Sequence, residues 1–155
     1  MTKLRILVVE DSETHLQSAI CVLEESGIDV VVARDECQGR ERMVHTGAEK
    51  VVPAVDGVIT DLFMPHSAHL PGDSGRQACG IAVALEAQHS GIPFVICTAG
   101  YHHGPRYEWI CALGRRLGWP EMVDCYNPNN PNAEAQRKDW GLALQRLIAL
   151  IEKKT

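Results

Sequence analysis

Four side chains that could act together lie directly after apolar runs of the chain. Glu10 and Asp11 follow the run at residues 4–9, Asp61 follows the run at 55–60, and Thr98 follows the run at 92–97. If these runs form parallel strands, their carboxyl ends meet at one edge of a sheet, where open α/β sheets place their chemistry. Three carboxylates and a hydroxyl at one edge favour metal-assisted chemistry on a phosphorus centre.

A cluster of acids is stable only if its charge is balanced. Two carboxylates about 5 Å apart repel by roughly 3 kcal/mol at an effective dielectric of about 20, and a divalent cation removes that cost. Oxygen ligands favour Mg²⁺ or Mn²⁺ over zinc or copper. Beside such an ion the Asp61 carboxylate could attack phosphorus and form an aspartyl phosphate. The Thr98 hydroxyl and nearby backbone N–H groups could then bind the phosphoryl oxygens.

The elements that position these residues alternate between strand and helix. Runs of β-branched and apolar residues predict strands at 4–9, 29–33, 55–60, 92–97 and 122–126. Apolar spacing predicts a helix after each strand. Asp11 or Ser12 would cap the first, Asp35 the second and Asn132 the last.

The third helix would start at Asp73 or Ser74, and the fourth would run from Pro105 to about residue 117. The second would extend to about His45. Five such repeats predict an α/β fold with a parallel sheet covered by helices on both faces. A chain of 155 residues is most simply one domain, here residues 1–155.

Composition excludes several classes of protein. The net charge of −5 gives no reason to expect nucleic acid or an anionic membrane as a partner. No apolar run approaches the ~20 residues of a membrane span, and the N-terminal run is too short for a signal peptide. The six cysteines form no C-x-x-C pair. We therefore expect reduced cysteines in or near the core of a cytoplasmic protein.

Three motifs occur in one order along this chain: the pair Glu10-Asp11 after the first apolar run, the block Asp-Leu-Phe-Met-Pro at 61–65, and Thr98-Ala99 after the fourth run. In this combination the chain resembles a response-regulator receiver domain of two-component signalling, of the single-domain chemotaxis-regulator type. The resemblance covers nearly the whole length. It implies a flavodoxin-like, doubly wound (βα)5 fold with strand order 2-1-3-4-5.

The resemblance also implies a role for each motif residue. Asp61 would accept a phosphoryl group from a histidine kinase or histidine phosphotransferase. Mg²⁺ would be bound by Asp11 and Asp61, by Glu10 through water, and by the backbone carbonyl of Phe63. Thr98 would bind the phosphoryl group. Any catalysis would be limited to self-phosphorylation and autodephosphorylation of Asp61.

The chain departs from the family pattern at two functional positions. The family has a Lys before a Pro after the fifth strand, and this chain has Asn127 before Pro128. Asn carries no charge to pair with a phosphoryl group. Asp124 stands where the family has an aromatic switch residue. Either phosphorylation persists with altered switching, or the chain is a degenerate receiver that acts by protein contact alone; the retained acids and Thr98 favour the first.

The expected partners follow from the same resemblance. A receiver without an output module must signal through another protein, which the sequence does not identify. The fourth helix, fifth strand and fifth helix would form the contact face, and a weak homodimer could form through the same face.

Other readings of these motifs are weaker. A phosphatase of the haloacid-dehalogenase type needs a second acid two residues after the nucleophile, where this chain has Phe63. A flavodoxin-like cofactor site would place a phosphate against Glu10 and Asp11, which would repel it. The loop histidines His66, His69, His102 and His103 are expected to be exposed or to edge the active site. They lack the cysteine partners of a structural zinc site.

Overall fold

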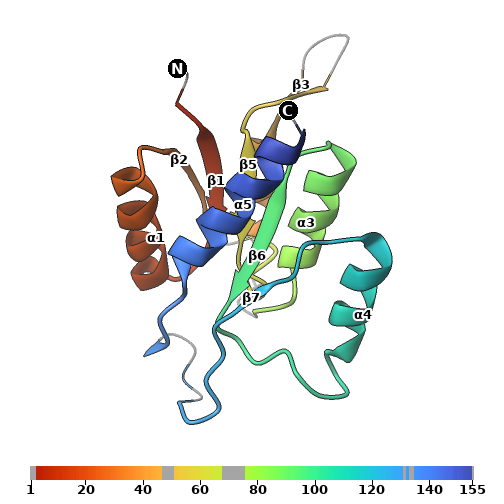
Figure 1. Cartoon of the computed structure of the whole chain (residues 1–155). Coiled ribbons are helices and arrows are strands. Elements are labelled where there is room, and N and C mark those ends of the chain that lie inside the picture. Colours follow the sequence, from red (N-terminus) through yellow and green to blue (C-terminus); the bar gives the residue numbers. More distant parts are fainter. Residues whose placement is uncertain (1–2, 47–50, 68–75, 131, 133–134, 155) are drawn as a thin grey trace.

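The computed structural model describes residues 3–46, 51–67, 76–130, 132 and 135–154. These residues form a five-stranded sheet in the order β2-β1-β5-β6-β7, and every neighbouring pair of strands is parallel (Figure 1). The flavodoxin-like fold and the predicted strand order are thereby confirmed. The strands are β1 (Arg5–Val9), β2 (Asp29–Ala33), β5 (Gly57–Thr60), β6 (Phe94–Thr98) and β7 (Val123–Asp124).

Helices cover both faces of this sheet, as right-handed crossovers between parallel strands require. Helices α1 and α5 pack against each other on one face (Figure 1). Helices α2 and α3 pack against each other on the other face. The helices are α1 (Glu13–Glu25), α2 (Glu36–Met43), α3 (Gly80–His89), α4 (Glu108–Leu117) and α5 (Trp140–Lys154).

The central strands are buried from both sides. Consecutive residues of a strand point to opposite faces, and in β5 Val58 packs in the core under α2 and α3, whereas Ile59 packs in the core under α1 and α5. Trp140 and Leu147 of α5 belong to the second core. Burial on both faces holds the ends of β1 and β5 firmly in place, and the acidic residues directly follow those ends.

A short hairpin replaces the end of the predicted second helix. Strand β3 (Val44–Thr46) pairs antiparallel with β4 (Val51–Pro53), in a register that sets Val44 opposite Pro53. Helix α2 therefore ends at Met43 and does not extend to His45. The prediction of a helix to about His45 is wrong, because Val44 and His45 pair with β4.

The starts of three helices differ from the prediction. Helix α5 begins at Trp140 rather than near Asn132, because the Asp139 side chain accepts a hydrogen bond from the backbone N–H of Leu142 at 2.9 Å and caps the helix there. Helix α4 begins at Glu108 rather than at Pro105.

Helix α3 begins at Gly80, because Gln77 before it forms a bridge with Met64. The predicted capping residues Asp73 and Ser74 lie outside the described residues, as does His69. Among the residues that the structure describes, no helix is long and apolar enough to cross a membrane. All six cysteines are free thiols; Cys97 is buried and Cys21 is exposed.

Candidate functional site

The acidic residues meet because β1 and β5 are neighbours. Val9 pairs with Thr60, so Glu10 and Asp61 leave adjacent strands at the same level. The backbone N–H of Asp61 donates to the carbonyl of Val9 at 2.9 Å. Carboxylate oxygens of Glu10, Asp11 and Asp61 all lie within 4.8 Å of one another. The structure thus brings together the three acids that the sequence pattern predicts at this edge of the sheet.

A buried lysine joins these acids, and sequence reasoning missed it. The Lys138 ammonium lies 2.5 Å from a Glu10 oxygen and 2.9 Å from Asp61 Oδ1. Its side chain is 1% exposed. An ammonium beside the strand-end aspartate is what the receiver pattern led us to expect at position 127. In this chain it comes from the residue before the Asp139 cap of α5.

Asn127 does not occupy the expected lysine position, which corrects the sequence assignment. Its side-chain oxygen accepts a hydrogen bond from the N–H of Asn129 at 2.9 Å, and its own N–H donates to the Gln136 side chain at 2.7 Å. Asn127 therefore organises the loop between β7 and α5.

The two ends of this loop meet. The Cys125 N–H donates to the carbonyl of Thr98 at 2.8 Å, and the Asp139 N–H donates to the Cys125 sulfur at 3.2 Å. Because these ends meet, Lys138 lies beside the acids that follow β1 and β5, although it is well beyond Asn127 in the sequence. The sequence does contain a signal for this lysine. Lys138 and Asp139 directly precede the apolar pattern of the last helix, so the start of that helix locates them.

The electrostatics of the site differ from one acid to the next. Glu10 is fully buried, and burial acts to raise its pKa. The nearby His15 ring, the Lys138 ammonium and a hydrogen bond from the Ser12 N–H outweigh burial and lower the pKa of Glu10 to about 2. At Asp61 burial is the stronger effect and raises the pKa, although Lys138 and the Leu62 N–H, 2.7 Å from Oδ1, oppose it.

The third acid retains an unused ligand atom. Asp11 Oδ2 accepts from the Arg76 side chain at 2.9 Å, whereas Oδ1 is buried and has no hydrogen-bond partner among the described residues. Burial raises the pKa of Asp11. A buried acceptor without a donor is costly, and a hard cation would satisfy it. The all-oxygen donor set and this oxygen both fit Mg²⁺ or Mn²⁺.

The remaining predicted residues lie at the same edge of the sheet. Thr98 ends β6 beside β5, is fully buried, and accepts a hydrogen bond from the Gly100 N–H at 3.2 Å. The Phe63 ring packs edge-to-face on Tyr107, with 5.3 Å between the ring centroids. A role for the Phe63 carbonyl as a metal ligand stays a prediction.

One loop histidine contacts the first turn of α2. His66 Nδ1 lies 2.8 Å from the Glu36 carboxylate, and the Cys37 sulfur is 3.6 Å from His66 Nε2. His66 is thus half-buried against the first turn of α2.

Comparisons with known proteins bear on the fold. No protein-family model and no curated protein matches the chain. Solved structures do match over nearly the full length of both chains. A CheY-like receiver domain from Methanospirillum hungatei JF-1 is 15% identical, with a TM-score of 0.62 over 99% of this chain and 100% of that one. The receiver domain of the Francisella response regulator 1452 is 19% identical, with a TM-score of 0.61 and the same coverage.

A third match is the bacteriophytochrome response regulator AtBRR, at 24% identity and a TM-score of 0.57, covering 95% of this chain and 94% of that one. The structural neighbours reported are therefore response regulators or their receiver domains. The chain has the fold of a response-regulator receiver domain, which confirms the resemblance drawn from its motifs.

Replacing Asp61 should make the metal-free protein more stable. Because burial raises its pKa in the folded state, an ionised Asp61 costs stability, and the cost grows as the pH rises from the ordinary value of 3.8 through the folded value. Asp61→Asn should raise the free energy of unfolding at pH 7 by about 0.5–2 kcal/mol. Urea unfolding at pH 7 and pH 3 measures it, and a gain that is equally large at pH 3 would contradict the electrostatic cause.

Proposed function

We propose that this chain is a response-regulator receiver, which accepts a phosphoryl group on Asp61 with the help of Mg²⁺ or Mn²⁺. The observation that carries the proposal is Lys138, whose ammonium lies 2.9 Å from Asp61 and 2.5 Å from Glu10. A strand-end carboxylate paired with a buried ammonium, beside two more acids, has the charges that a phosphoryl acceptor needs. The receiver fold of the neighbours supports it.

The metal would be bound by Asp11 and Asp61, by Glu10 through water, and by the Phe63 carbonyl. It would neutralise the acids and the incoming phosphoryl oxygens. An Asp61 oxygen attacks phosphorus, an O–P bond forms, and the P–N bond of a donor phosphohistidine breaks. The imidazole leaves with its electron pair and takes a proton from solvent. Before the transfer the Lys138 ammonium pairs with the Asp61 carboxylate. After the transfer it pairs with the oxygens of the new phosphoryl group.

Thr98 would bind the phosphoryl group after its transfer to Asp61. Its hydroxyl accepts from the Gly100 N–H, so its own proton is available for a phosphoryl oxygen. Movement of Thr98 toward that oxygen would pull on the loop that starts at Ala99 and leads to α4. The signal would leave through α4, β7 and α5 to a downstream protein, and a weak homodimer could use the same face. Trp109 and Leu117 are exposed apolar side chains of α4.

One observation favours a second function, a phosphorylation-independent interaction module. Asp124 stands where receivers carry an aromatic switch residue, and in the structure it pairs with His103 at 2.8 Å. A carboxylate held in this way cannot rotate into an apolar slot as an aromatic ring would. Such a chain could bind its partner equally well with and without phosphate.

Incubation with acetyl phosphate or phosphoramidate and Mg²⁺ should add one phosphoryl group to the protein, because Asp61 is the acid paired with Lys138. Intact-mass spectrometry measures the gain. Asp61→Asn should abolish it, whereas the exposed Asp29→Asn should not. No gain in the unmodified chain, or a gain that persists in Asp61→Asn, would contradict the proposal and favour the interaction module.

A further inference from the structure

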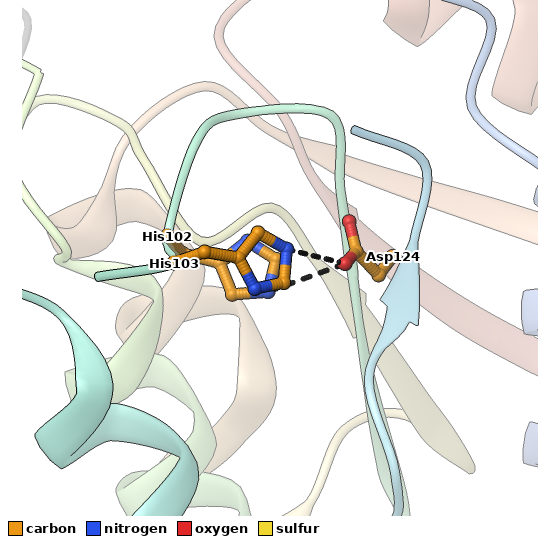
Figure 2. Close-up of side chains that lie close together, drawn as sticks. All are labelled: His102, His103 and Asp124. Carbon is orange, nitrogen blue, oxygen red and sulfur yellow. Dashed lines mark hydrogen bonds and ion pairs between the residues drawn. The ribbon is translucent and has the colours of Figure 1, made fainter. Parts of the chain in front are cut away.

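A second cluster of metal-ligating side chains lies between the loop after β6 and strand β7. His102 and His103 belong to the loop, and Asp124 pairs with Thr98 across the sheet. Figure 2 shows both imidazole rings directed at the Asp124 carboxylate. Nε2 of His103 lies 2.8 Å, and Nε2 of His102 3.7 Å, from the same oxygen, Asp124 Oδ2. The ligand atoms of all three residues lie within 4.8 Å of one another.

The buried histidine presents a free lone pair to this cluster. His102 is only 2% exposed, so it is not the exposed residue that was one of the two expectations for the loop histidines. Its Nδ1 lies 3.0 Å from the Gly100 carbonyl oxygen, which can only accept, so Nδ1 carries the hydrogen. In the neutral ring Nε2 is then an acceptor, and it faces a carboxylate oxygen. Two acceptors that face each other at 3.7 Å repel unless a proton or a cation lies between them.

We infer that His102, His103 and Asp124 form a binding site for a divalent transition metal ion of the Zn²⁺ class, separate from the acidic site at Asp61. Two imidazoles and one carboxylate suit Zn²⁺ or Co²⁺, whereas the all-oxygen site suits Mg²⁺. With metal–ligand bonds of about 2.0–2.1 Å, ligand atoms of a tetrahedral site lie about 3.4 Å apart. The separation at His102 is already close to that value. His103 is half exposed and can move outward as the ion replaces the proton that it shares with Asp124.

Hydrogen bonds to neighbouring groups orient the three ligand side chains, as they do in known metal sites. The Gly100 carbonyl fixes the tautomer of His102, and the Tyr126 N–H donates to Asp124 Oδ1 at 2.9 Å, which leaves Oδ2 for the ion. His102 and His103 also line an open hollow against α4. This hollow offers the ion a path from solvent and room for water at its fourth position.

A bound ion would tie the loop after Thr98 to strand β7. That loop is otherwise joined to β7 at this point by the pair of His103 and Asp124 and by the weaker contact of His102. The site would therefore make the position of the loop depend on metal as well as on events at Thr98. Metal binding can be measured on the unphosphorylated chain.

Titration of the chelator-treated full chain with Co²⁺ and Zn²⁺ tests this inference. We expect one Zn²⁺ per chain by calorimetry, a melting temperature that rises with Zn²⁺ concentration, and a tetrahedral Co²⁺ spectrum without thiolate-to-cobalt charge transfer. His103→Gln and Asp124→Asn should each weaken binding by at least about tenfold. His103 is half exposed, so its variant should match the parent's melting temperature without metal.

Two control variants separate this site from its competitors. Asp61→Asn should keep Zn²⁺ binding, because it alters only the acidic site. His66→Gln should keep it too, although His66 lies near the Cys37 thiol. The inference is overturned if the chain binds no Zn²⁺, if binding survives both His103→Gln and Asp124→Asn, if it is lost in His66→Gln, or if the Co²⁺ spectrum shows thiolate ligands.

Discussion

Lys138→Met should lower the free energy of unfolding by about 3–5 kcal/mol, because it removes one partner of a buried ion pair and leaves the other charged. Glu10 is fully buried, and its pKa of about 2 keeps it ionised at neutral pH. Without the ammonium, the Glu10 carboxylate would retain, among the residues that the structure describes, the His15 ring and the Ser12 N–H as partners. Urea unfolding at pH 7 without divalent ions measures the loss.

A double variant identifies the cause. Glu10→Gln added to Lys138→Met removes the stranded charge and should recover a substantial part of the lost stability, so the two changes should be strongly non-additive. Lys153→Met removes an exposed ammonium from the end of α5 and should leave stability nearly unchanged. If Lys138→Met is no more costly than Lys153→Met, the buried pair is not a major source of stability.

The sequence alone is not sufficient to assign Lys138 to the site. Glu10, Asp11 and Asp61 could be found because each directly follows a buried strand, so the local pattern fixes their place in the fold. Lys138 follows a loop whose length no sequence pattern fixes. Counting residues forward from the fifth strand therefore leads to Asn127 instead of Lys138. Contacts between distant residues, such as Gln136 with Asn127, return the chain to the site, and these contacts leave no periodic signal.

Two other misses have the same physical origin. The hairpin of β3 and β4 depends on pairing between two three-residue segments. Such segments are too short to show a reliable period, so the sequence pattern predicts that the helix continues into the first of them. The polar character of His102 and its place in a loop predict that it is exposed or edges the active site, and the structure buries it. Its burial comes from the Gly100 carbonyl and the fold of its own loop. Local composition predicts the sheet well and loop burial poorly.

Gly80→Ala should damage both stability and the candidate phosphoryl site. Helix α3 starts so close to the end of β5 that a Cβ at position 80 would lie 2.0 Å from the Asp61 carbonyl oxygen and 2.9 Å from Leu62 Cα. These are backbone atoms and cannot rotate aside, so the helix or the strand end must move. We expect a loss of about 1–3 kcal/mol or more in the free energy of unfolding, as for other overpacked sites.

The same displacement should slow phosphorylation by acetyl phosphate, because the backbone that moves is that of Asp61 itself. Gly141→Ala is the matched control. It lies in the first turn of α5, and the nearest atom to its added Cβ is Asp139 Oδ1 at 3.6 Å, an ordinary contact. It should leave stability equal or higher, by up to about 1 kcal/mol. Equal behaviour of the two variants in urea unfolding and in the mass assay would show that the close approach of α3 does not hold Asp61 in place.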